Sequence, residues 1–353
     1  MAPAVPSAHV RTGTEVTDMS DAALATTTAD ATVSFAIPRR ALGALRGWHV
    51  YLALGLAAIG AYYRLPKAGW GQCILLTTLN ATAALVAARA AWRGRGWSRV
   101  LWISLGFAML LSAVGNGPYF GYPLVTGRIL PFPSPVDAVL LAAFPFFALA
   151  LVALTRIHRG ARRRGRLLDA GILVIGGGLV LWEQMVVPTA AFPLPKFALQ
   201  VSVAYPVLDV VLFALLAWFL AVASGRNAAT GWLVASYVIL LAGAAEFSAQ
   251  VGAGTYAYGG PTDALWMLSY LLVGVAALHP ASITAPRPAG APRRATAVVR
   301  FVVVTGALLV GPVMLVVGTH QGTLVGYATA LAAVFAVARV LRSVRRPAPA
   351  LAY

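Results

Sequence analysis

The stretch VSVAYPVLDVVLFALLAWFLAV, residues 201–222, decides the fold class of this chain. About 20 apolar residues cross the hydrocarbon core of a bilayer as one helix, and the single charged residue in this stretch is Asp209. Similar stretches fill most of the 353 residues, which are 60% hydrophobic and 10% charged, with a mean hydropathy of +0.80. This composition excludes an ordinary water-soluble domain. We predict an all-α, polytopic membrane helical bundle in the plasma membrane, with the lipid bilayer as its main partner.

The chain contains ten apolar stretches that are long enough to be transmembrane helices. They are residues 47–64, 70–92, 100–122, 136–155, 167–187, 197–223, 229–249, 263–280, 298–318 and 322–342. We therefore expect, in order, a disordered cytoplasmic tail, an eight-helix membrane module, a cytoplasmic linker rich in proline and arginine, two further transmembrane helices and a short cytoplasmic tail. These parts are residues 1–46, 47–280, 281–297, 298–343 and 344–353.

The basic residues predict the orientation, because Lys and Arg remain mainly on the cytoplasmic side of a membrane. The net charge is +17, and arginines gather after the even-numbered spans, most densely from Arg156 to Arg166. The linkers on the other side hold only Arg64, Lys67, Arg128 and Lys196. Both termini are therefore expected in the cytoplasm. The same confinement of charge to short loops argues against a nucleic-acid partner.

Beyond residue 46 only six carboxylates occur, and most of them interrupt apolar stretches. They are Asp137, Asp169, Glu183, Asp209, Glu246 and Asp263. A carboxylate at the centre of a bilayer costs roughly 2.5 to 3.5 kcal/mol, so each of these needs a partner or a use. Asp209 lies near the middle of its span, and Tyr205, one helical turn earlier, is placed to hydrogen-bond it. The alternative is that such acids are neutral, hydrogen-bonded groups that only join helices.

Asp137 and Asp263 each open a predicted span. Ser134, Pro135 and Asp137 fit the N-cap, first and third positions of a helix, and a carboxylate there stabilises the helix N-terminus without any other role. Two aromatic residues that follow Asp263 also have a simple interpretation. Trp266 and Tyr270 are typical of the aromatic belt at a membrane surface.

Two pairs of segments predict a parallel four-helix repeat. PSPVDAVLLAAF, residues 133–144, is similar to GPTDALWMLSY, residues 260–270. WISLGFAMLLSAVGN, residues 102–116, aligns with WLVASYVILLAGAAE, residues 232–246, so that Asn116 corresponds to Glu246. Chance similarity between alanine-rich and leucine-rich segments is the alternative. AAFP at 142–145 and VAYP at 203–206 each place an aromatic residue before a helix-kinking proline, which predicts two helices that face one cavity.

Four strings, taken together, suggest a family. They are PSPVDAVLLAAFPFFALALVAL, RRRGRLLDAGILVIGGGLVLWEQMVV, VSVAYPVLDVVLFALLA and TDALWMLSYLLVGVAALHP. This set resembles the N-terminal membrane region of actinobacterial signalling proteins that carry GGDEF, and often EAL, domains, over roughly residues 48–343. The resemblance implies a sensor or anchor beside a cytoplasmic domain that makes or breaks cyclic di-GMP. No GGDEF or EAL string occurs in this sequence, so cyclase activity is not carried over to it.

The leading hypothesis is a sensor-like module that binds a small ligand or protons in an outward-facing cavity and acts on a cytoplasmic or membrane signalling partner. The predicted ligand-binding residues are Asp209, Glu183, Glu246, Tyr205, Tyr270, Asn116, Asp137, Asp263 and Trp266. A proton-coupled secondary transporter is the alternative, because a carboxylate near the midplane suits it equally. We predict no catalytic residue, cofactor or metal, since the five histidines and one cysteine are scattered and no hydrolase motif is present.

Overall fold

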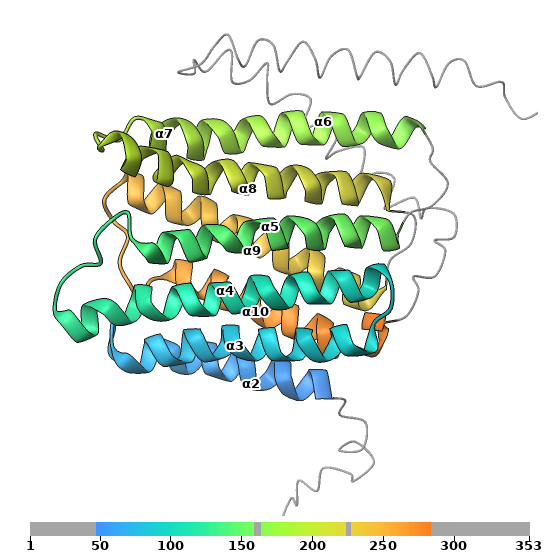
Figure 1. Ribbon diagram of the computed structural model, residues 1–353, viewed down its shortest axis with the longest axis horizontal. Helices are drawn as coiled ribbons and strands as arrows, with labels where there is room; N and C mark the ends of the chain where they lie inside the picture. Colours follow the sequence, from blue (N-terminus) through green and yellow to red (C-terminus); the bar gives the residue numbers. More distant parts are fainter. Residues whose placement is uncertain (1–46, 159–163, 224–226, 284–353) are drawn as a thin grey trace, which may run out of the picture. The chain divides into compact units, whose positions relative to one another are not determined.

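The computed structural model describes residues 47–158, 164–223 and 227–283, and in these ranges the long elements are all helices (Figure 1). They are α2 Gly47–Tyr62, α3 Trp70–Arg93, α4 Trp97–Thr126, α5 Pro135–Ile157, α6 Arg164–Leu181, the π-helical turn η1 Trp182–Val186, α7 Val187–Ala190, α8 Lys196–Val222, α9 Ala228–Gly252, α10 Pro261–Leu278 and the 3-10 turn η2 Pro280–Ile283. The prediction of an all-α fold is confirmed for this part of the chain.

Seven of the described helices are long and apolar enough to cross a membrane, with α6, η1 and α7 together forming one of them over Leu168–Ala190. The eighth, α2, has 16 residues. It therefore rises only about 24 Å, less than the roughly 30 Å of a hydrocarbon core. These helices make the chain an integral membrane protein, and a helix occupies each of the first eight predicted spans. The spans 298–318 and 322–342, and both terminal tails, lie outside the described residues.

Local sequence signals explain several helix ends. Pro135 occupies the first turn of α5, and the Ser134 N–H donates to Asp137 Oδ2 at 2.7 Å, as the predicted helix start requires. The start of α9 is capped by Asn227, whose Oδ1 accepts from the Thr230 N–H at 2.9 Å. The helix α4 continues a few residues beyond the predicted span 100–122, past its internal prolines, and stops at Gly127, which adopts the left-handed conformation.

The helices pack through small residues. α10 contacts α2, α3 and α9, and it is the most buried of the described spans. On α3, the buried residues Ala83, Ala87 and Ala90 let neighbouring helices approach closely. In the glycine run of α6, a Cβ atom at Gly177 would collide with the Phe213 ring of α8. This run therefore lies at a close contact between α6 and α8.

Candidate functional site

Asp263 lies in the first turn of α10 and is completely buried, at 0% exposure. Its Oδ2 accepts hydrogen bonds from the Tyr62 hydroxyl at 2.5 Å and from the Gly259 N–H at 2.8 Å. Its Oδ1 has no hydrogen-bond partner in the described part of the chain. One oxygen of the carboxylate therefore joins the end of α2 to the start of α10, and the other oxygen can still accept a hydrogen bond or a proton.

Asp137 forms a similar tie at the start of α5. Its Oδ2 accepts from the backbone N–H and hydroxyl of Ser134, and its Oδ1 accepts from the Tyr205 hydroxyl of α8 at 2.9 Å. The expectation that Tyr205 bonds to Asp209 is therefore wrong. α5 and α8 pack together here, and the Phe144 and Tyr205 rings meet edge to face with centroids 6.2 Å apart. The aromatic residues of the AAFP and VAYP strings thus contact each other.

Further tyrosines lie between the two carboxylates. Tyr119 of α4 is within electrostatic range of both Asp137 and Asp263, and its ring packs on Tyr258 with centroids 5.6 Å apart. In the loop before α10, burial raises the pKa of the Tyr256 hydroxyl, and the charge of Asp263 raises it further. No described residue hydrogen-bonds this hydroxyl, although it is buried. We call this set the carboxylate–tyrosine cluster; its members are Tyr62, Tyr119, Asp137, Tyr205, Tyr256, Tyr258 and Asp263.

A second group of polar residues lies deeper, where α3, α4 and α10 meet. The Asn116 amide donates to the Tyr270 hydroxyl at 3.5 Å, which is a long hydrogen bond. Asn80 of α3 is completely buried within electrostatic range of the same hydroxyl. Neither polar atom of its side chain makes a hydrogen bond with a described residue. The structure thus brings the predicted residues Asn116 and Tyr270 together and adds Asn80, which was not predicted.

Asp209 and Glu183 lie apart from the cluster, on α8 and η1. Asp209 is 6% exposed and makes no hydrogen bond or ion pair with a described residue. Glu183 is half-buried, and its Oε1 is a buried atom without a partner among the described residues. Gly177 faces Phe213 and Gly178 faces Val210, so α6 and α8 run antiparallel. In this register, Glu183 lies about one helical turn nearer than Asp209 to the end of the bundle that holds the carboxylate–tyrosine cluster.

The two remaining predicted residues lie on α9 and α10. Glu246 is exposed and accepts from the Gln250 amide at 2.6 Å, while Gln250 in turn accepts from the Thr262 hydroxyl at 3.1 Å. Trp266 packs beside Gly243 and against the Phe247 ring, with centroids 5.4 Å apart. Glu246 therefore belongs to a surface chain of hydrogen bonds, and Trp266 contributes to helix packing.

Sequence reasoning missed four members of the cluster, Tyr62, Tyr119, Tyr256 and Tyr258. Each lies near the end of a helix or in a loop, where a tyrosine is ordinarily read as an interfacial anchor. The partner of Tyr62 is 201 positions away in the sequence, so no local spacing indicates the contact. The pair Tyr62 and Tyr63 at the end of an apolar run was the one available signal.

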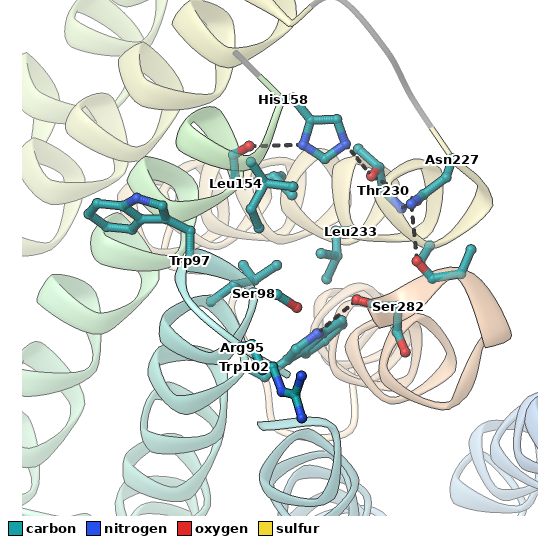
Figure 2. A pocket seen from close by; sticks show the side chains of 14 residues that line it. Arg95, Trp97, Ser98, Trp102, Leu154, His158, Asn227, Thr230, Leu233 and Ser282 are labelled. Atoms are coloured by element: carbon teal, nitrogen blue, oxygen red, sulfur yellow. Dashed lines mark hydrogen bonds between the residues drawn. The ribbon is translucent and has the colours of Figure 1, made fainter. Parts of the chain in front are cut away.

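A pocket lies at the other end of the bundle, between α4, α5 and α9, and Figure 2 shows the side chains that line it. We call it the larger pocket. Its volume is about 240 Å³, and none of the nine predicted site residues lines it. A smaller pocket of about 20 Å³ adjoins the carboxylate–tyrosine cluster at Tyr258 and is lined also by Gln72 and Phe120. The smaller pocket holds about one water-sized molecule.

In the described ranges, no three His, Cys, Asp or Glu side chains lie close enough together to hold a metal ion. No protein-family model, curated protein or solved structure matches the chain. The function is therefore inferred from the chain's own residues. Among these, the carboxylate–tyrosine cluster combines buried carboxylates and unpaired polar atoms with residues from several helices.

Proposed function

We propose that this chain is a membrane-embedded sensor module whose carboxylate–tyrosine cluster binds a proton or a small hydrogen-bonding ligand. The observation that carries the proposal is the unpaired Oδ1 of the fully buried Asp263. A proton on Oδ1 leaves the bonds of Tyr62 and Gly259 to Oδ2 intact and turns an acceptor into a donor. The neighbouring Tyr256 hydroxyl also has no partner among the described residues, so the cluster has capacity for one more bonding group.

α10 offers a route from this cluster to the other end of the bundle. It begins at Asp263, runs buried between α2, α3 and α9, and is followed by η2, which lines the larger pocket. Because Tyr62 is bonded to Asp263, a change at this carboxylate acts on α2 and α10 together. We propose that the resulting shift between these helices is read by a cytoplasmic or membrane signalling partner. The resemblance to the membrane region of GGDEF proteins supports the same proposal, since its landmarks include Asp137, Tyr205 and Asp263.

Infrared difference spectroscopy on the full chain in nanodiscs tests the proposal directly. The carboxyl band is followed from about pH 4 to about pH 9, a range that covers the ordinary and raised values of buried carboxyl groups. We expect a titrating carboxyl signal that Asp263→Asn removes. Glu246→Gln is the matched control, because Glu246 is exposed and outside the cluster. An unchanged signal in Asp263→Asn would show that this carboxylate is not the responsive group.

A proton-coupled transporter remains the second candidate because of Asp209. This carboxylate is buried near the middle of α8 without a hydrogen bond from any described residue, as expected for a group that exchanges protons. The measurement is proton flux into proteoliposomes, followed with an entrapped pH-sensitive dye. Flux that Asp209→Asn abolishes and Asp263→Asn preserves favours transport. Flux no greater than in empty liposomes rejects it.

A further inference from the structure

The larger pocket lies at the end of the bundle opposite the carboxylate–tyrosine cluster, and Figure 2 shows Arg95 among the side chains that line it. We infer that it binds a phosphate group, carried either by an anionic lipid headgroup or by a soluble phosphate. The inference is independent of the proposed sensing by Asp263. It rests on the backbone, the charges and one hydroxyl group of the pocket wall.

Two helix N-termini converge on this pocket. Trp97 and Ser98 belong to the first turn of α4, and Ala229 and Thr230 belong to the first turn of α9. The first turn of a helix has unpaired N–H groups and a partial positive charge, which together favour an anion. α4 begins at Gly96, and no side chain caps this end, so its first N–H groups have no side-chain competitor for a ligand. At α9 the Thr230 N–H already donates to Asn227 Oδ1, so this end contributes mainly the partial charge of the helix dipole.

The side chains around the pocket add positive charge. Arg95 lines the pocket, and the Arg156 guanidinium lies 5.3 Å from the ring centroid of Trp97, which forms part of the wall. Among the described residues that line the pocket, none is acidic. An anionic ligand therefore meets cationic groups and two helix N-termini without a facing carboxylate.

Most other polar groups of the wall already bond to the protein. His158 is 3% exposed and bridges the Leu154 carbonyl at 2.9 Å and the Thr230 hydroxyl at 2.9 Å, as Figure 2 shows. The Trp102 indole N–H donates to the Ser282 carbonyl at 3.1 Å. These bonds join α4, α5, α9 and η2 into a preformed wall, so a ligand meets groups that are already held in position.

The Ser98 hydroxyl differs from these groups. It lines the pocket, its oxygen is buried, and no described residue hydrogen-bonds it. Leaving a buried hydroxyl unpaired is costly, and an oxygen of a bound anion supplies the acceptor that it lacks. A phosphate group has oxygens in tetrahedral directions. It can therefore bond to Ser98, to the uncapped N-terminus of α4 and to Arg95 together, whereas the two oxygens of a carboxylate lie in one plane.

The test uses the full chain in two settings. In a sugar-based detergent that contains no phosphate, inorganic phosphate is titrated by calorimetry. In nanodiscs that contain phosphatidic acid and phosphatidylcholine with the same acyl chains, the lipids retained by the protein are measured by native mass spectrometry. Saturable binding in detergent identifies a soluble phosphate as ligand, and selective retention of phosphatidic acid identifies a lipid headgroup.

Two variants connect binding to the pocket. Ser98→Ala and Arg95→Gln should each weaken the phosphate-bearing ligand about tenfold, the usual loss for one hydrogen bond to a charged group. Because the Ser98 hydroxyl has no partner among the described residues, its removal should not lower the unfolding temperature without ligand. Arg93→Gln is the matched control, an exposed arginine two positions away that does not line the pocket. Absence of binding in both settings, or an equal loss in Arg93→Gln, overturns the inference.

Discussion

The Tyr62 hydroxyl donates a hydrogen bond to Asp263 Oδ2 at 2.5 Å, although 201 positions separate the two residues. This bond connects the end of α2, which is shorter than a membrane span, to the start of α10, the most buried span. Both residues are completely buried. The short helix is thus held to the bundle by a polar bond as well as by apolar packing.

Tyr62→Phe removes this bond and leaves a buried carboxylate oxygen with one donor fewer. We expect the free energy of unfolding to fall by about 1.5 to 3 kcal/mol, the range for hydrogen bonds to charged groups. Tyr63→Phe is the control, because the Tyr63 hydroxyl donates to the Gly260 carbonyl in an exposed position. Thermal unfolding in detergent compares the two. Equal destabilisation would contradict a special role for the Tyr62 bond.

Asp137 and Asp263 should respond differently to replacement by Asn. Both oxygens of Asp137 accept hydrogen bonds. Asp137→Asn removes the charged acceptor and forces the Tyr205 hydroxyl to accept from the new amide instead of donating, and we expect a loss of about 2 to 3 kcal/mol. Asp263 uses only Oδ2, so in Asp263→Asn the side-chain carbonyl can replace it while the amide takes the place of Oδ1. The expected loss there is about 1 kcal/mol or less. Denaturant unfolding of both variants measures the difference, and the reverse order would refute the hydrogen-bond pattern.

Gly177 and Gly178 give a matched pair on α6. A Cβ at position 177 collides with the Phe213 ring, so Gly177→Ala should cost about 1 to 3 kcal/mol through overpacking. A Cβ at position 178 meets only the Val210 Cγ1 at 3.9 Å, an ordinary contact. Gly178→Ala should therefore be neutral or slightly stabilising, because Ala favours a helix. Similar unfolding temperatures for the two variants would contradict the described packing of α6 on α8.

The helices could be predicted because each apolar stretch is interpretable by itself. The start of α5 could be predicted in the same way, since Ser134, Pro135 and Asp137 are neighbours in the sequence. The hydrogen-bond partners of the acids are distant in the sequence and could not. Tyr205 precedes Asp209 by one turn, yet its hydroxyl reaches Asp137 because α5 packs against that face of α8. The choice between two acids depends on helix packing, which apolar sequence specifies weakly.

The larger pocket was missed for a related reason. Its polar residues come from four separate elements, and each is ordinary where it stands in the sequence: Ser98 after a glycine turn, His158 at the end of a helix, Asn227 at a helix start. The arginine-rich linkers were interpreted as topology alone. Nothing in the spacing of these residues indicates that the starts of α4 and α9 meet.

The predicted orientation can be tested with introduced cysteines, because Cys73 is buried and is the only cysteine of the chain. In a Cys73→Ala background, Arg128→Cys should react with a membrane-impermeant maleimide in intact cells, since the loop between α4 and α5 is predicted to be outside. Arg93→Cys should react only after the membrane is broken. Both positions are exposed, so access to the reagent depends on the side of the membrane. The opposite pattern would reverse the topology and place the carboxylate–tyrosine cluster at the cytoplasmic end.

Asp209 provides a test that separates function from structure. A buried polar group without a hydrogen bond lowers the stability of the fold by about 1 to 3 kcal/mol, and no described residue compensates Asp209. Asp209→Leu, which is similar in size and apolar, should therefore raise the unfolding temperature. The same substitution at Asp137 should lower it, because three donors lose their acceptor. If Asp209→Leu is stabilising, the fold gains nothing from this carboxylate, and its presence in the apolar stretch 201–222 has to be explained by proton exchange or ligand binding. If the variant is destabilised like Asp137→Leu, Asp209 has a structural partner and the transporter proposal loses its main support.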